Sequence, residues 1–173
     1  KSCPVMISVE KACFNNYKIK KIVHTEFELS REEAIKEIAK MIDNKDIIVA
    51  TTGKTSRELF EFRKSINSGH QRDFLTVGGM GHANQIALGV ALSKKDRIVY
   101  CLDGDGALLM HAGSMGIIGD RSPKNFKHIV LNNGSHDSVG GQPTISFNID
   151  YKKIVKGFKY NKVLKAKSKE ELR

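Results

Sequence analysis

Short apolar runs alternate with amphipathic segments from residue 30 onward. The apolar runs are rich in β-branched residues and short, which is typical of strands buried on both faces of a sheet. They cover residues 47–50, 74–77, 98–102 and 128–131, and a weaker one covers residues 162–166. The segments between them carry apolar residues at helical spacing over residues 34–42, 55–66, 82–93, 106–118 and 151–158. This alternation predicts an α/β fold, a doubly wound parallel sheet of about six strands with helices on both faces.

Three pairs of residues have the spacing of a capping box, in which a hydroxyl and a carboxylate satisfy free amides at the start of a helix. They are Ser30 with Glu33, Thr55 with Glu58, and Ser168 with Glu171. The last pair has almost no helix after it, because the sequence stops at Arg173. We therefore expect a lead-in or linker segment over residues 1–29 and one domain over residues 30–173 that is truncated at its C-terminal end.

The composition is that of one globular domain. With 173 residues and 40% hydrophobic content, the chain can bury a core. No apolar run approaches the ~20 residues of a membrane span, and the N-terminal residues lack the apolar centre of a signal peptide. Cys3, Cys13 and Cys101 form no CxxC pair and leave an odd thiol in any disulfide scheme. We expect a cytoplasmic protein without a membrane partner, with Cys101 buried as a small hydrophobic residue.

The net charge of +10 points at first to a nucleic-acid-binding protein. The excess lies near the C-terminus, because residues 145–173 hold nine basic and three acidic side chains, whereas residues 78–144 hold six and five. The C-terminal lysines are not interleaved with the aromatic side chains of a base-stacking surface. We therefore expect no nucleic-acid partner, and a basic nucleic-acid-binding domain remains only as a remote alternative to an enzyme.

Glycines mark the region where a ligand is expected. Twelve of the 15 lie between Gly78 and Gly141, mostly just after the expected strands. Loops at the carboxyl ends of parallel strands are where α/β sheets bind ligands. Two common phosphate motifs fail: residues 53–55 end like a Walker A loop, but Ile48 stands where its first glycine belongs, and the sequence has no GxGxxG.

Asp105 and Asn133 are the candidates for a metal site. Residues 104–106 read Gly-Asp-Gly after one expected strand, and the next strand ends in Asn-Asn, with Asn133 28 residues after Asp105. One strand–helix–strand unit would bring the two side chains to adjacent strand ends. Their oxygens are hard ligands suited to Mg²⁺, and the amides of residues 106–108 at a helix start suit a diphosphate. The alternative is a pair of tight turns, which glycine and asparagine commonly form.

The Gly-Asp-Gly and Asn-Asn pair resembles the cofactor-binding motif of the thiamine-diphosphate-dependent decarboxylases and synthases. Similarity to the phosphonopyruvate branch of this family, with the sulfopyruvate decarboxylases as near relatives, rests on residues 51–58, 78–83, 102–107 and 131–143. The resemblance covers roughly residues 30–173. It implies the cofactors thiamine diphosphate and Mg²⁺ and a carboxy-lyase that decarboxylates a small anionic 2-oxoacid.

The resemblance also implies roles for individual residues. Asp105 and Asn133 would ligate Mg²⁺ through their side chains, and Ser135 would do so through its carbonyl. The residues expected to contact the cofactor are Thr55, Ser56, Gly78, Met80, Gly104, Gly106, Ala107 and Ser138. The Gly78 carbonyl would accept a hydrogen bond from the 4′-amino group. Met80 would hold the cofactor bent, and its alternative role is that of an ordinary core methionine.

Three further side chains would serve the substrate: Lys54, His82 and His136, whereas His111 is expected to face helix packing. Lys54 and His136 are the candidates for neutralising the anionic substrate. Family members activate the cofactor with a glutamate on a separate pyrimidine-binding domain, which this chain is too short to hold. The resemblance therefore implies completion by a pyrimidine-binding domain or subunit, a homo-oligomeric full-length protein, and an inactive isolated chain. The β subunit of a sulfopyruvate decarboxylase is the alternative assignment.

Overall fold

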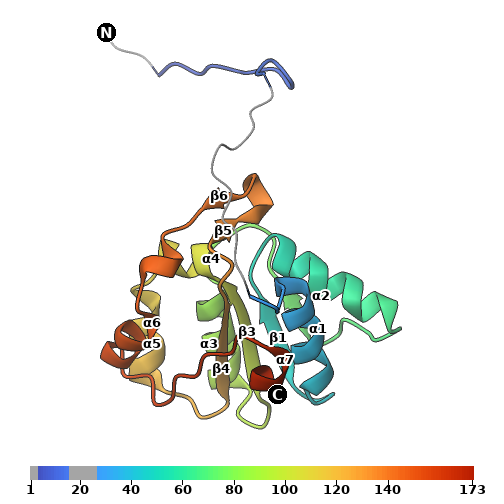
Figure 1. Cartoon of the computed structure of the whole chain (residues 1–173), viewed down its shortest axis with the longest axis vertical. Coiled ribbons are helices and arrows are strands. Elements are labelled where there is room, and N and C mark those ends of the chain that lie inside the picture. Colours follow the sequence, from blue (N-terminus) through green and yellow to red (C-terminus); the bar gives the residue numbers. More distant parts are fainter. Residues whose placement is uncertain (1–3, 16–26) are drawn as a thin grey trace.

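The computed structural model describes residues 4–15 and 27–173 (Figure 1). Its main strands are β1 (Ile47–Ala50), β2 (Asp73–Leu75), β3 (Val99–Gly104) and β4 (Phe126–Leu131), and a hairpin is formed by β5 (Ser135–His136) and β6 (Gln142–Pro143). Its α-helices are α1 (Arg31–Met41), α2 (Lys54–Ser65), α3 (Ala83–Ser93), α4 (Asp105–Met110), α5 (Ser114–Arg121), α6 (Tyr151–Gly157) and α7 (Lys169–Leu172). Short 3₁₀ turns are η1 (Asp137–Val139) and η2 (Ser146–Asn148). None of the helices in the described part of the chain is long and apolar enough to cross a membrane.

Four parallel strands form the central sheet in the order β2-β1-β3-β4. From β1 the chain moves outward to β2, and from β3 it moves outward in the opposite direction to β4. The loops that follow β1 and β3 therefore diverge at adjacent strand ends. This is the switch point at which open α/β sheets bind their ligands.

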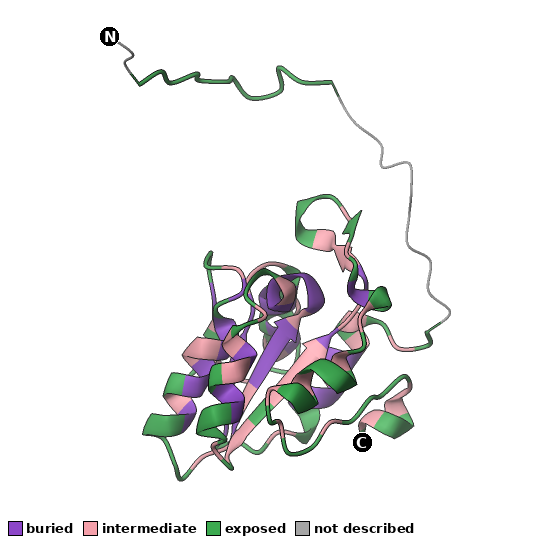
Figure 2. Ribbon diagram, turned by 90° about the vertical axis from the view of Figure 1, so that its left-hand side faces the viewer, coloured by how far each residue is buried: buried purple, intermediate pink, exposed green. Residues whose placement is uncertain are grey.

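Helices cover both faces of the sheet (Figure 1). Successive residues of a strand point to opposite faces, so Ile48 and Ala50 join a core cluster with α1 and α2, whereas Val49 joins one with α3. The central strands are accordingly buried along most of their length (Figure 2). These layers confirm the doubly wound α/β fold that the hydrophobic pattern predicts.

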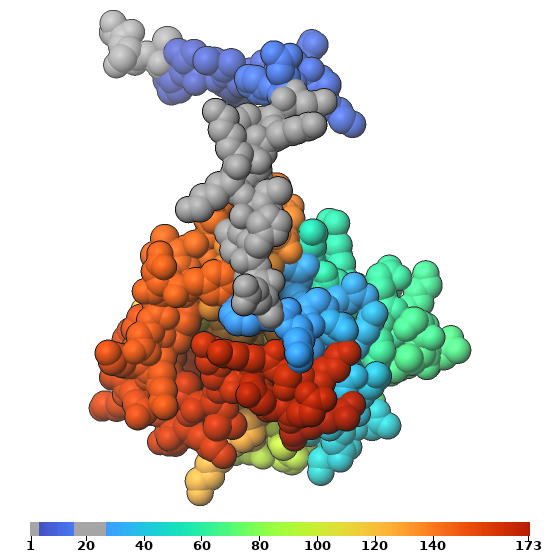
Figure 3. Space-filling model, in the orientation of Figure 1, coloured from blue at the N-terminus to red at the C-terminus, as the bar shows by residue number. Residues whose placement is uncertain are grey.

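The main sheet has four strands, fewer than the six expected, and residues 162–166 are not a strand. After α6 the chain turns at Lys159, which has a φ of 64°, and then crosses in front of the sheet to α1 (Figures 1 and 3). Leu164 is 79% exposed on this crossing. The apolar residues that suggested a buried strand therefore belong to an extended surface segment.

The capping box predicted for α1 forms, and the one predicted for α2 does not. Ser30 and Glu33 make both reciprocal hydrogen bonds. Helix α2 begins directly after Gly53, whose φ of 93° suits glycine, so Thr55 lies inside the first turn rather than before it. The Glu58 carboxylate is consequently directed outward from α2 to the side chain of Arg31.

Two further helix predictions are modified. At α7 the hydroxyl of Ser168 accepts a hydrogen bond from the amide of Glu171, but the Glu171 carboxylate accepts from the amide of Lys167 instead of closing the box. The helix expected over residues 106–118 is broken into α4 and α5 at His111, whose backbone leaves the helical region.

Candidate functional site

The candidate metal ligands lie a few positions at most beyond the last paired residues of β3 and β4, which are Gly104 and Leu131. Asp105 begins α4 and is 2% exposed, and Asn133 lies two positions beyond β4. Because β3 and β4 are parallel neighbours, both residues lie at the same edge of the sheet. Thr144 donates a 2.5 Å hydrogen bond to Oδ2 of Asp105, which fastens the chain after β6 to this edge.

A compact set of hydrogen bonds organises the loop after β4. Oδ1 of Asn133 accepts from the backbone amide of Ser135 at 3.2 Å, and Nδ2 of Asn133 donates to Oδ2 of Asp137 at 3.0 Å. The Ser135 hydroxyl donates to the other oxygen of Asp137, also at 3.0 Å. Asp137 therefore holds both Asn133 and Ser135, although its role is not evident from the sequence motif.

Arg31, the first residue of α1, joins this loop to the helical layer. Its Nη1 donates to Oδ2 of Asp137 at 2.7 Å, and its Nε and Nη2 donate to the two oxygens of Glu58 at 2.9 and 2.7 Å. The hydrogen bonds with Glu58 raise the pKa of Arg31. Burial by itself would raise the pKa of Asp137, but hydrogen bonds from Arg31 and Ser135 hold it below its usual value. Arg31 and Asp137 are thus both charged at neutral pH.

The turn after β2 depends on glycine. Gly78, Gly79 and Gly81 have φ values of 75°, 57° and 86°, which residues with a Cβ rarely adopt. Apart from its chain neighbours, no described residue would lie within 4 Å of a Cβ added at Gly78 or Gly79, so the turn borders open space. The amide of Gly78 donates to the Thr52 hydroxyl at 3.2 Å. Met80 is half-buried in this turn and belongs to neither buried core cluster.

His82 and His111 lie together beside this turn. Nδ1 of His82 lies 3.2 Å from the carbonyl oxygen of Gly79, and the two imidazoles have centroids 4.3 Å apart. His111 is exposed, which corrects the expectation that it faces helix packing; it lies in the break after α4. A Cβ at Gly81 would lie 2.5 Å from the His111 ring, so the approach of the two segments requires glycine there.

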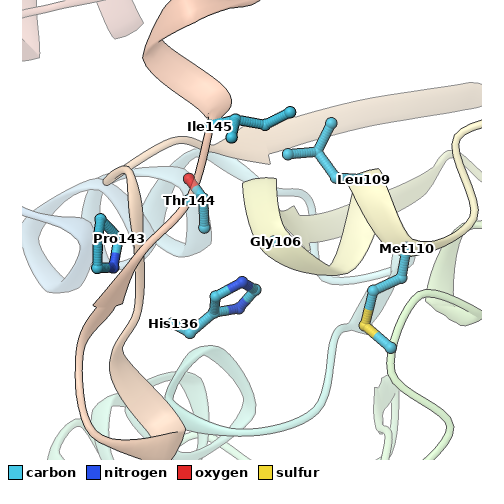
Figure 4. A pocket seen from close by; sticks show the side chains of 7 residues that line it. All are labelled: Gly106, Leu109, Met110, His136, Pro143, Thr144 and Ile145. Atoms are coloured by element: carbon cyan, nitrogen blue, oxygen red, sulfur yellow. The ribbon is translucent and has the colours of Figure 1, made fainter.

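His136 lies over the first turn of α4 (Figure 4). A Cβ at Gly106 would lie 2.4 Å from the His136 ring, so glycine is needed for this contact as well. The two residues line a pocket of about 320 Å³ together with side chains from α4 and from the chain after β5, namely Leu109, Met110, Pro143, Thr144 and Ile145. The pocket places the His136 imidazole next to an apolar surface. Gly106, which also lines the pocket, directly follows Asp105 in the chain.

Gly104 and Ala107 lie at the end of β3 and in α4, whereas Lys54, Thr55, Ser56 and Ser138 lie at or beside the start of α2. The backbone amide of Lys54 donates to the Ser138 hydroxyl at 3.0 Å, which joins α2 to η1. Thr55 and Ser56 are buried, and the Ser56 hydroxyl donates to the carbonyl of Thr51 at 2.7 Å, so this hydroxyl serves the backbone. Thr51 supplies a candidate that the sequence reasoning missed, because its buried hydroxyl has no hydrogen-bond partner among the described residues.

A buried polar network lies beneath the site, centred on Asp103 in β3. Its carboxylate accepts from the next backbone amide at 2.9 Å and from Nδ2 of Asn84 at 3.1 Å, and it lies 3.3 Å from Nε2 of His128. Nδ1 of His128 lies 3.0 Å from the hydroxyl of Tyr160. Cys101 completes a group whose ligand atoms lie within 4.8 Å of one another. Burial and the charge of Asp103 raise the pKa of the Cys101 thiol, which therefore remains protonated.

The residues present fit Mg²⁺ with a diphosphate. Asp105, Asn133 and the Ser135 carbonyl offer hard oxygens near one sheet edge, which is the donor chemistry that Mg²⁺ prefers. The Thr51 hydroxyl, which lacks a partner in the part of the chain that the structure describes, lies at the end of β1, the strand next to β3. The open space beside Gly78 leaves room for a ligand at the same end of the sheet.

Comparisons with known proteins identify the family of the chain. Residues 51–173 match the family model described as thiamine pyrophosphate enzyme, C-terminal TPP binding domain. The chain is 41% identical over 125 residues to a phosphonopyruvate decarboxylase of Streptomyces viridochromogenes, covering 72% of this chain and 30% of the relative. It is 36% identical over 128 residues to the sulfopyruvate decarboxylase subunit beta of Methanocaldococcus jannaschii, covering 73% of this chain and 65% of that subunit.

Two solved structures support the fold independently. A putative thiamin diphosphate-dependent enzyme from Mycobacterium smegmatis superposes with a TM-score of 0.66 at 20% identity, over 84% of this chain and 28% of that one. The benzoylformate decarboxylase from Polynucleobacter necessarius gives a TM-score of 0.65 at 17% identity, over 90% of this chain and 32% of that one. At these identities the likeness concerns the fold alone.

Fold and matches together define a cofactor-binding domain of the thiamine-diphosphate-dependent class. The chain belongs to the thiamine pyrophosphate enzyme family and matches the C-terminal TPP binding domain of that family. The cofactor expected from the sequence, thiamine diphosphate, is thereby confirmed. The chain spans about a third of the phosphonopyruvate decarboxylase and about two thirds of the sulfopyruvate decarboxylase β subunit.

Proposed function

We propose that this chain is the diphosphate-binding domain of a 2-oxoacid decarboxylase that converts phosphonopyruvate to phosphonoacetaldehyde and CO₂. The observation that carries the proposal is the common position of Asp105, Asn133 and Ser135 just beyond β3 and β4. The 41% identity to a phosphonopyruvate decarboxylase supports the choice of substrate.

Asp105 and Asn133 would hold Mg²⁺ through their side chains, with the Ser135 carbonyl as the third protein ligand. Mg²⁺ keeps several positions for phosphate oxygens and water. The diphosphate would lie against a set of small residues at the same edge, which are Thr55, Gly104, Gly106, Ala107 and Ser138. The cofactor supplies an electron sink for the carbanion that decarboxylation leaves. Gly78 and Met80 would orient its rings, since their turn borders open space.

Lys54, His82 and His136 would serve the substrate. A second anionic group beside the 2-oxoacid needs cationic or hydrogen-bonding partners. Lys54 lies at the start of α2, and His136 lines the pocket over Gly106. A pyrimidine-binding domain or subunit would supply the glutamate that activates the cofactor. We propose that this chain acts with such a partner in a homo-oligomer, that the functional domain comprises residues 30–173, and that residues 1–29 lead into it.

A sulfopyruvate decarboxylase is the second candidate. It is supported by the 36% identity to a sulfopyruvate decarboxylase β subunit, of which the chain covers 65%. Phosphonopyruvate and sulfopyruvate share the 2-oxoacid and differ in the second anionic group, so they place similar demands on Lys54 and His136.

Steady-state decarboxylation by the complete protein that contains this chain tests the proposal. We expect the highest kcat/KM with phosphonopyruvate, a lower value with sulfopyruvate and the lowest with pyruvate. A higher value with sulfopyruvate would support the second candidate. An Asp105→Ala variant should lose Mg²⁺-dependent affinity for thiamine diphosphate by at least about 10-fold, as loss of a direct ligand costs no less than loss of its supporting partner. Unchanged affinity would refute the ligand assignment.

A further inference from the structure

We infer that Arg31 is a positioning residue for the proposed metal site and acts through Asp137 on Asn133 and Ser135. This inference rests on the proposed function, because it concerns the same metal ligands. Arg31 lies 102 positions before Asn133 in the sequence. It lies outside the motifs of the metal loop, which is the loop after β4 that carries Asn133 and Ser135.

Arg31 is itself held rigidly. Its guanidinium makes three hydrogen bonds of 2.7–2.9 Å to two carboxylates, and its side chain is only 15% exposed. Glu58 takes a two-point contact from one side, which fixes the plane of the guanidinium. The remaining Nη1 then points to Asp137. An exposed ion pair held by a single contact would contribute little to stability. The pair of Arg31 and Asp137 is instead partly enclosed, and its arginine is anchored by two helices, α1 and α2.

Asp137 passes this constraint to the metal loop. Its Oδ2 accepts from both Arg31 and Asn133, and its Oδ1 accepts from the Ser135 hydroxyl. Both proposed ligand residues after β4 are therefore tied to one carboxylate. Loss of Arg31 would leave Asp137 partly buried without its cation and free to turn away from them.

The contact with Asp137 also decides which end of the Asn133 amide can bind a cation. A carboxylate accepts hydrogen bonds and donates none when ionised, so it selects the NH₂ end of the amide. The oxygen end is then directed away from Asp137. In this structure that oxygen accepts the amide of Ser135 at 3.2 Å, which leaves a second lone pair for a metal. Partners that orient ligand residues in this way typically change metal affinity 10–100-fold when removed.

Mn²⁺ serves as the probe, titrated by electron paramagnetic resonance into the complete protein with saturating thiamine diphosphate. Arg31→Met should weaken Mn²⁺ binding by about 10-fold or more. Simple charge repulsion predicts the opposite sign, because the substitution removes a cation near a divalent cation. Arg31→Lys should restore only part of the affinity, since a lysine cannot contact Glu58 at two points and still reach Asp137. Unchanged or tighter binding by Arg31→Met would overturn the inference.

Arg63→Met is the matched control. Arg63 lies near the other end of α2 and makes a two-point contact of 3.0 and 3.2 Å with Asp73, at the start of β2 and away from the metal loop. The Arg63→Met variant should have a lower midpoint temperature of thermal unfolding but an unchanged Mn²⁺ affinity. If both arginine variants weaken Mn²⁺ binding equally, Arg31 acts only through stability and the inference fails.

Two additional variants complete the design. If Arg31→Met does not fold, Asp137→Asn tests the same link, because an amide at position 137 no longer selects the NH₂ end of Asn133. Unchanged Mn²⁺ affinity in this variant would refute the inference.

Asp105→Ala separates the two proposals. If it binds Mn²⁺ as tightly as the parent protein, the proposed function fails. If Asp105→Ala loses the metal and Arg31→Met retains it, only the role of Arg31 fails.

Discussion

Lys169, at the start of the last helix, donates a 2.8 Å hydrogen bond to Glu33 in the first helix. The contact fastens α7 to α1, and Arg173 makes a second one to Glu37 at 2.8 Å. These ion pairs hold the C-terminal segment against the helical layer together with Leu172, which packs against the core cluster of α1 and α2 (Figure 3). The position of α7 therefore depends on these charges as well as on apolar packing.

We predict that this contact weakens in acid. The hydrogen bond from Lys169, followed by those from Ser30, lowers the pKa of Glu33 from 4.5 to about 2. A carboxylate with a depressed folded-state pKa binds its proton more readily in the unfolded state, so its contribution to stability is complete above about 4.5 and is lost as the pH falls through about 2. The titration of the Glu33 carboxyl carbon, followed by NMR, should have its midpoint near 2.

Lys169→Met provides the control for that titration. The midpoint of Glu33 should rise only part of the way toward 4.5, because the hydrogen bonds from Ser30 remain. Amides of α7 should then exchange faster with solvent at neutral pH. A Glu33 midpoint above 4 in the unaltered protein would contradict the ion pair.

Two cysteines should differ sharply in reactivity. Cys101 is fully buried in β3, and burial together with Asp103 raises its pKa, whereas Cys13 is exposed. In a Cys3→Ser background, a disulfide reagent at pH 8 should modify Cys13 rapidly. Cys101 should react at least about 10³-fold more slowly, since exposure requires an opening that costs ~5 kcal/mol or more. Equal rates for the two thiols in the native protein would show that β3 is not buried as described.

The buried strands could be predicted from the sequence because parallel strands covered on both faces are apolar along their whole length. Residues 47–50 show this clearly. Residues 162–166 show where the rule fails, since a few apolar residues among lysines are equally compatible with an extended crossing segment. Only the presence of a neighbouring strand decides between the two, and that depends on how distant parts of the chain pack.

The residues of the candidate site likewise fall into those that the sequence could predict and those that it could not. Asp105 and Asn133 could be predicted together because the connectivity of one strand–helix–strand unit determines which strand ends are adjacent. Arg31 and Asp137 could not, because their contact depends on how α1 packs beside the loop after β4. Asp103 was also missed, since a carboxylate at the end of an apolar strand gives no signal of the partners that surround it.

Two glycine-to-alanine substitutions should change stability in opposite directions. At Gly119 a Cβ would lie 1.6 Å from the carbonyl oxygen of Phe158, so α5 and the segment after α6 would have to separate. We expect Gly119→Ala to lower the unfolding free energy by about 1–3 kcal/mol. Gly89 lies exposed in α3, and beyond its own helix backbone no described residue would lie within 4 Å of an added Cβ, so Gly89→Ala should raise the unfolding free energy by about 0.5–1 kcal/mol. Urea unfolding measures both, and a stabilising Gly119→Ala would contradict the close packing.

Asp103→Asn should destabilise the fold more than its small change in shape suggests. The carboxylate is fully buried and accepts from Asn84, beside His128. An amide at this position would turn a donor toward one of these partners, so we expect a loss of about 1–3 kcal/mol in the free energy of unfolding, measured with urea by circular dichroism. Asp120→Asn, on the exposed surface of α5, is the matched control and should change it by less than ~0.5 kcal/mol. If the two variants are equally stable, the network does not depend on the charge of Asp103.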